Sequence, residues 1–124
     1  MNEEELKYHI VLQEVYKEKA GRWQWYDRWH DPADGEEGVV MPGQLKSFRR
    51  GDFSSYILIP FTIDPYNEDR GLLKMINNLM EINKYSKTWE VWTYDETAQV
   101  NRYVASTLTL ALLKALANQE GVEV

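Results

Sequence analysis

The sequence predicts an α+β domain in which a mostly antiparallel sheet of about four or five strands is packed with three helices. Three observations lead to this class. An apolar helical segment spans Ser106–Gln119, two alternating segments form a hairpin over Thr88–Ala105, and a helical repeat opens the chain over Asn2–Lys19. With 124 residues, 44% of them hydrophobic, the chain is long enough for a single domain over residues 1–124 with a hydrophobic core.

The C-terminal helix is the segment around which we expect the domain to be organised. Eight of the ten residues in Leu108–Ala117 are apolar, and they surround most of the circumference of the helix. A helix of this kind is normally buried by other elements. Ser106 or Thr107 can cap its start, and Gly121 stands where a helix usually ends. The segment is too short to span a membrane.

The first element in chain order is a helix over Asn2–Lys19, capped by Asn2 and ended by Gly21. Three glutamates follow the cap and suit the positive end of the helix dipole. We expect these carboxylates, and His9 further along, to lie in solvent. The predicted buried stripe consists of Tyr8, Val11, Leu12, Val15 and Tyr16.

The region after this helix is predicted to contain three strands and two loops. Arg22–His30 alternates aromatic and polar residues and is predicted as a half-buried strand. Asp31–Gly38 is rich in turn residues, and Val39–Met41 is a short strand. Gln44–Asp52 is predicted as a flexible loop that carries the densest basic patch of the chain. Ser55–Ile59 is strongly apolar, which favours a strand near the interior of the sheet.

The second half begins with a middle helix that is predicted to start at Asp64 or Asn67 and to continue to Asn83. The hairpin follows, because Thr88–Asp95 and Gln99–Ala105 both alternate and are separated by a turn of about four residues. Its second strand leads directly into the C-terminal helix.

Composition excludes several classes of function. The chain has no cysteine, so disulfides and thiolate metal sites are excluded. A net charge of −6 argues against nucleic acid as a default partner, and leaves open a basic protein surface. The acidic N-terminal stretch is followed by no apolar signal core, and we expect a cytoplasmic protein without cofactor or membrane contact.

Aromatic and arginine side chains on the hairpin are the best candidates for ligand binding. Stacked rings beside a guanidinium can hold a planar base and a phosphate. The alternative is that the rings form the core face of the sheet and the arginines its rim. The hairpin candidates are Trp92, Tyr94, Arg102 and Tyr103, and the residues that could complete the pocket, across a dimer, are Trp25, Arg28, Arg49 and Arg50.

No catalytic motif is present, since the sequence has neither a glycine-rich phosphate loop nor a nucleophile elbow. Asp27, His30 and Glu90 are the residues on which a hydrolase would have to depend. His30 with Asp31 and Asp34 is more typical of a solvated turn than of a metal site.

Pro65–Leu79 carries the pattern Pro-Tyr, a capping residue, an Asp and then helix-forming residues. It stands before a tryptophan-bearing hairpin, Trp89–Val104, and a terminal helix rich in Ala and Leu, Thr107–Ala117. This order resembles the phage ABA sandwich domain family, named for its α-β-α layers, over roughly Tyr56–Ala117. The sequence departs from the family at Gly71, where Ala is usual.

The resemblance implies α-β-α layering, a phage or prophage origin, and the cytoplasm of a bacterial host. It implies no enzyme activity. We therefore expect a non-enzymatic counter-defence protein, compatible with a homo-oligomer. It would sequester a small nucleotide-type immune signal or inhibit a host defence protein. The alternatives are a small hydrolase that acts on such a signal, and a structural or assembly accessory protein of the phage.

Overall fold

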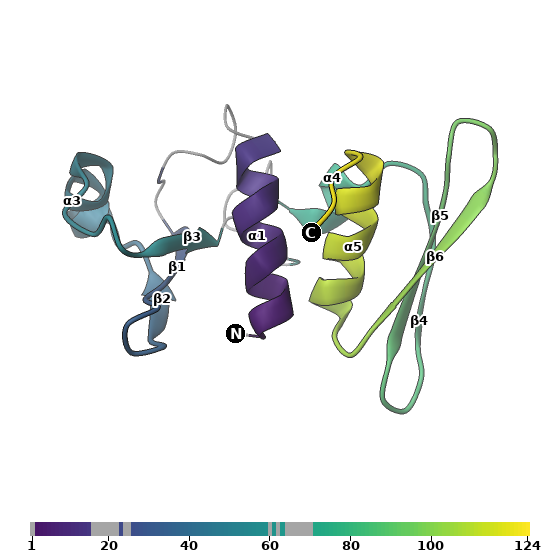
Figure 1. Cartoon of the computed structure of the whole chain (residues 1–124), viewed down its shortest axis with the longest axis horizontal. Helices are drawn as coiled ribbons and strands as arrows, with labels where there is room; N and C mark the ends of the chain where they lie inside the picture. The colour runs from purple at the N-terminus through teal and green to yellow at the C-terminus, as the bar shows by residue number, and fades with distance from the viewer. Residues whose placement is uncertain (1, 16–22, 24–25, 60, 62, 64–70) are drawn as a thin grey trace.

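Two helices lie side by side at the centre of the molecule, with a three-stranded antiparallel sheet on either side of the pair (Figure 1). The computed structural model describes residues 2–15, 23, 26–59, 61, 63 and 71–124. One sheet has the order β2-β1-β3 and the other the order β4-β5-β6. The strands are β1 (Arg28–His30), β2 (Glu37–Val39), β3 (Ile57–Ile59), β4 (Leu79–Lys84), β5 (Trp89–Tyr94) and β6 (Val100–Ala105). The helices are α1 (Glu3–Val15), η1 (Pro42–Gln44), α3 (Leu45–Arg50), α4 (Leu72–Met75) and α5 (Leu108–Gln119).

The α+β class and the antiparallel pairing are confirmed, but the strands are divided between two small sheets instead of forming one sheet of four or five. Helix α1 packs on β3 and on α5, and α5 packs on β5 and β6. The described layers therefore run sheet, helix, helix, sheet, which differs from the expected α-β-α order.

Helix α5 has the position and the boundaries that the sequence predicts. Thr107 is the N-cap, and its Oγ1 accepts a hydrogen bond from the Leu110 amide at 3.1 Å. Gly121, with φ of 68°, follows the last turn. The helix is shielded on several sides because α1, α4 and the β5–β6 hairpin all pack against it. Its buried residues are Leu110, Ala111, Leu112, Leu113, Ala115, Leu116 and Ala117.

The hairpin is also confirmed. Strands β5 and β6 pair antiparallel from Trp89 opposite Ala105 to Tyr94 opposite Val100. Because side chains alternate along a strand, Trp89, Val91 and Thr93 all face α5, and Val91 is fully buried there.

The predicted middle helix is wrong beyond α4, which ends at Met75. Asn78 adopts φ of 57°, and the chain then continues as β4. The apolar residues Leu79 and Ile82 suit a strand as well as a helix, and in the structure they lie opposite Thr93 and Val91 of β5. Pairing with β5 thus overrides the helical spacing, while residues 64–70 lie outside the described part of the chain.

Three predictions in the first half are corrected. Within the described residues of Arg22–His30, only β1 is a strand, because Tyr26 has φ of 65° in a turn. The predicted loop Gln44–Asp52 contains α3, which is held by the buried Phe48, whose ring lies 4.4 Å from that of Phe53. Strand β3 is an edge strand, and it is buried because α1 covers it.

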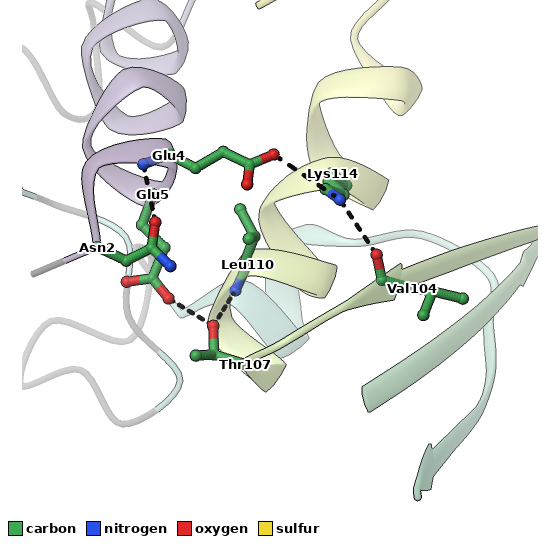
Figure 2. Close-up of polar contacts among 7 residues, drawn as sticks. All are labelled: Asn2, Glu4, Glu5, Val104, Thr107, Leu110 and Lys114. Atoms are coloured by element: carbon green, nitrogen blue, oxygen red, sulfur yellow. Dashed lines mark hydrogen bonds and ion pairs between the residues drawn. The ribbon is translucent and has the colours of Figure 1, made fainter. Parts of the chain in front are cut away.

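Helix α1 buries a polar face. Glu5 and His9 are both buried, together with Leu12, so the expectation that Glu5 and His9 lie in solvent is wrong. The Thr107 hydroxyl donates to Glu5 Oε1 at 2.5 Å, which ties the first turn of α1 to the cap of α5 (Figure 2). Residues 16–19 of the predicted helix lie outside the described part.

A lysine adds a second polar link between the same elements. Lys114 donates to the Val104 carbonyl at 3.1 Å and lies 3.9 Å from a Glu4 carboxylate oxygen (Figure 2). Polar contacts from the first turn of α1 therefore join the two central helices, and Lys114 also joins α5 to the end of β6.

Candidate functional site

Trp92 and Arg102 are brought together as the sequence predicts. They lie opposite each other on the outer face of the hairpin, and the guanidinium carbon is 5.8 Å from the centre of the indole ring. Both side chains also bind Glu90, which is only 3% exposed. The Trp92 Nε1 group donates to Glu90 Oε1, and Arg102 Nε donates to Oε2 at 2.5 Å.

The Glu90 carboxylate is held in its ionised form. The hydrogen bond from Trp92, followed by the contacts with Arg102, lowers its pKa, although burial raises it. An ionised Glu90 balances the charge of Arg102, so the guanidinium already has an anionic partner within the chain.

The two tyrosines of the predicted site separate. Tyr103 lies opposite Val91, on the helix-facing side of the hairpin, and packs against the core. Its hydroxyl accepts a hydrogen bond from Asn118 at 2.6 Å. Tyr94 is 42% exposed at the end of β5. The four hairpin candidates therefore do not all lie on one face of the hairpin.

Three further candidates, all arginines, lie in the other half of the molecule, beyond the two central helices (Figure 1). Arg28 is on β1, while Arg49 and Arg50 are on α3. Arg49 donates to the Trp23 carbonyl at 2.9 Å, and Arg50 pairs with Asp52 at 2.5 Å. Within one chain these arginines do not share a pocket with Trp92, and a site shared between two copies stays a prediction. Trp25 lies outside the described residues.

The residues proposed for a hydrolase do not converge either. His30 lies on β1 and is 3.1 Å from Glu37, whereas Glu90 lies on β5 in the opposite sheet. Asp27 is buried just before β1. In the described part of the chain, no group of three or more His, Asp or Glu side chains could hold a metal ion.

The structure instead shows a polar cleft at the loop end of the β4-β5-β6 sheet. Its volume is about 390 Å³, and three segments form its walls: the turn between α4 and β4, the end of the hairpin, and the last turn of α5. The lining residues are Ile76, Asn77, Asn78, Thr93, Tyr94, Asp95, Glu96, Thr97, Asn101, Tyr103, Ala115, Asn118 and Gln119.

The walls of the cleft are held together by hydrogen bonds. Gln119 accepts from the Asn77 amide at 2.7 Å and donates to the Met75 carbonyl at 3.0 Å. The Tyr94 amide donates to the Asn78 carbonyl at 3.2 Å. These bonds join α5 and β5 to the same turn and hold the walls of the cleft in place.

The charge of the cleft is negative. Asp95 and Glu96 are the charged side chains among its described lining residues, and no Lys, Arg or His accompanies them. The C-terminal end of α5 adds the negative end of a helix dipole. This is the opposite of the electrostatic character that a phosphate-bearing ligand requires.

Two of the cleft residues, Tyr94 and Tyr103, belong to the predicted site, and the others were missed. A signal for them exists in the sequence. Only Ser106 and Thr107 separate β6 from α5, so the helix must run back along the hairpin. Its 12 residues span about 18 Å, close to the roughly 20 Å of the six residues of β6. The polar Asn118 and Gln119 must therefore reach the hairpin loop.

The chain matches no family model, no curated protein and no solved structure. None of the described helices has the length and the apolar character needed to cross a membrane.

Proposed function

We propose that this chain is a non-enzymatic binding protein that recognises a partner protein through the polar cleft at the loop end of the β4-β5-β6 sheet. The observation that carries the proposal is the cleft itself. Hydrogen bonds join its walls, and its described polar lining residues are Asn, Gln, Tyr, Thr, Asp and Glu, without a histidine or lysine base. Such a lining suits recognition better than bond cleavage.

The charge of the molecule favours a protein target. The net charge of −6 attracts basic protein surfaces and repels phosphate-rich ligands. The resemblance to small phage proteins supplies the biological context of the proposal, in which the target is a host defence protein and the chain acts by occupying it.

A nucleotide-type ligand is the second candidate, because Trp92 and Arg102 form a cation–π pair on the outer face of the hairpin. The bond between Arg102 and Glu90 weighs against it. Incubation of the purified protein with cyclic dinucleotides and ADP-ribose derivatives, followed by mass spectrometry, separates the possibilities. A sponge retains such a ligand and releases it unaltered on heating, a hydrolase returns it altered, and our proposal expects neither retention nor alteration.

The proposal is tested in bacteria that each carry one defined phage-defence system. We expect the protein to restore phage plating in at least one strain, and the Asp95→Asn, Glu96→Gln double variant to lose at least tenfold of that effect. In Asp95→Asn, the side-chain oxygen that accepts the loop hydrogen bonds remains.

The matched control is Asp34→Asn with Glu36→Gln, which removes the same two charges from the turn between β1 and β2 in the opposite sheet. This control should restore plating as well as the unaltered protein does. Failure to restore plating in any strain would contradict the counter-defence proposal, and equal loss in both double variants would contradict the role of the cleft.

A further inference from the structure

We infer that the group recognised by the cleft is the guanidinium of an arginine presented by the partner protein. This inference rests on the proposed function and adds the chemistry of the contact. It follows from the charge of the cleft, from the geometry of one carboxylate, and from the aromatic and carboxamide groups that surround it.

The charge of the cleft favours a cationic ligand. Asp95 and Glu96 line the cleft together with the C-terminal end of α5, and no cationic side chain of the described lining neutralises them. The nearby Arg102 is already bound to Glu90 on the outer face of the hairpin. A cation from outside the chain is therefore the ligand that the cleft attracts, and a phosphate is repelled.

Hydrogen bonds within the hairpin loop orient the Asp95 carboxylate. All three of its side-chain hydrogen bonds go to Oδ1, from the Thr97 amide at 2.9 Å, the Thr97 hydroxyl at 2.6 Å and the Gln99 amide at 2.9 Å. These bonds, first that of the Thr97 hydroxyl and then that of the Gln99 amide, lower the pKa of Asp95. The carboxylate is thus ionised and immobile, while Oδ2 remains available as an acceptor.

The lining of the cleft favours a guanidinium over an ammonium ion. A guanidinium is planar, carries several donors in one plane, and stacks on aromatic rings, whereas an ammonium is a compact, strongly hydrated charge. Tyr103, on the helix-facing side of the hairpin, lines the cleft together with Asn101 and Asn118. Asn118 donates its NH₂ group to the Tyr103 hydroxyl, so its oxygen is left to accept. The volume of the cleft, about 390 Å³, lies in the range of small-ligand sites.

The experiment uses the full chain and five probes. These are the peptide Gly-Gly-Arg-Gly-Gly, its lysine and citrulline counterparts, free agmatine, and adenosine monophosphate. Citrulline has the shape of arginine without its charge. Binding is followed by the ¹H–¹⁵N resonances of the Glu96 and Thr97 amides and of the side-chain NH₂ groups of Asn118 and Gln119.

We expect the arginine peptide to shift these resonances, with an affinity at least threefold above that of the lysine peptide and tenfold above that of the citrulline peptide. Adenosine monophosphate should leave them unshifted. The Asp95→Asn, Glu96→Gln variant should bind the arginine peptide at least tenfold more weakly, and Asp34→Asn with Glu36→Gln should bind it as the unaltered protein does.

Equal binding of the citrulline and arginine peptides would overturn the inference, and so would shifts caused by adenosine monophosphate. Lysine-peptide binding as tight as that of the arginine peptide would overturn the choice of guanidinium. If agmatine binds as tightly as the arginine peptide, the ligand is a free small cation, and the inference that a partner protein presents the guanidinium is overturned. The cleft variant could fail to restore phage plating while the unaltered protein binds no arginine peptide. That pair of results would support the proposed function and refute this inference.

Discussion

His9 is the buried side chain with the clearest consequence for stability. It is 1% exposed, and its ring stacks on Phe61 at 5.9 Å between centroids. Burial, together with the charge of Arg28, lowers its pKa to about 3. The folded protein therefore holds a neutral imidazole at every pH above that value, while the unfolded chain takes up a proton near pH 6.5.

Only the unfolded chain binds this proton between these two pH values. The free energy of unfolding therefore falls as the pH is lowered from about 6.5 toward about 3. A single such group contributes a slope of up to about 1.4 kcal/mol per pH unit. We expect His9→Leu to remove this slope between pH 6.5 and 5.5, where ordinary carboxyl groups are still ionised. Urea unfolding at a series of pH values measures it.

The informative quantity in this experiment is the difference in slope between the unaltered protein and the variant, because other groups contribute equally to both. Identical slopes for the two proteins would contradict a buried, neutral His9. The absolute stability of the variant does not enter the comparison.

Among the elements, the β5–β6 hairpin loop stores backbone strain. Ala98 adopts φ of 63°, a conformation that costs a residue with a side chain about 1–2 kcal/mol and glycine almost nothing. Asp95 keeps the loop in this form through its hydrogen bonds to Thr97 and Gln99. We expect Ala98→Gly to stabilise the protein by about 1 kcal/mol, seen as a higher urea midpoint.

The matched control is Ala33→Gly in the turn between β1 and β2, where the alanine does not have a positive φ. Glycine there only increases the freedom of the unfolded chain, so stability should fall by up to about 1 kcal/mol. A stability change of the same sign in both variants would show that the strain at Ala98 is not the cause.

Local sequence patterns are enough to predict some of the secondary-structure elements but not others. Helix α5 and the hairpin were predicted because each has a strong period, a clear cap or turn, and polar residues at its ends. Leu79–Asn83 is predicted as helix because Leu79 and Ile82 have helical spacing, and only pairing with β5, with a register shift between Leu79 and Glu81, makes this segment a strand. The helix Leu45–Arg50 is held by Phe48, which packs against the rings of Trp23 and Phe53. No local pattern predicts these contacts.

At the scale of the whole molecule, the contact between α1 and α5 joins the two sheets into one structure. Leu112 lies fully buried within the core that surrounds α5. We expect Leu112→Ala to reduce the free energy of unfolding by about 2–5 kcal/mol, because it removes buried methyl groups and leaves a cavity. Tryptophan fluorescence and circular dichroism during urea unfolding should report the same loss.

The control is Leu73→Ala, the same truncation at a side chain that is 43% exposed on α4. It should cost less than about 1 kcal/mol. A similar cost at both positions would contradict the assignment of α5 to the centre of the core.

The candidate site follows the same division. Trp92 and Arg102 came together as predicted, because residues that face each other across a hairpin are determined by its turn and register. Asn118 and Gln119 were missed because they join the cleft only when α5 folds back to the hairpin loop. Arg28, Arg49 and Arg50 were grouped with the hairpin by composition, and the division into two sheets separates them from it.

The sequence by itself determined the α+β fold class, the buried C-terminal helix, the tryptophan-bearing hairpin and the net negative charge. Each of these depends on the period, the end signals or the composition of one short segment. Only the tertiary structure decided that the strands form two sheets, that Glu5 and His9 are buried, and that a negative cleft lies at the end of α5. These features depend on contacts between residues far apart in the chain, and no local pattern specifies which distant partner a strand or a polar side chain will have.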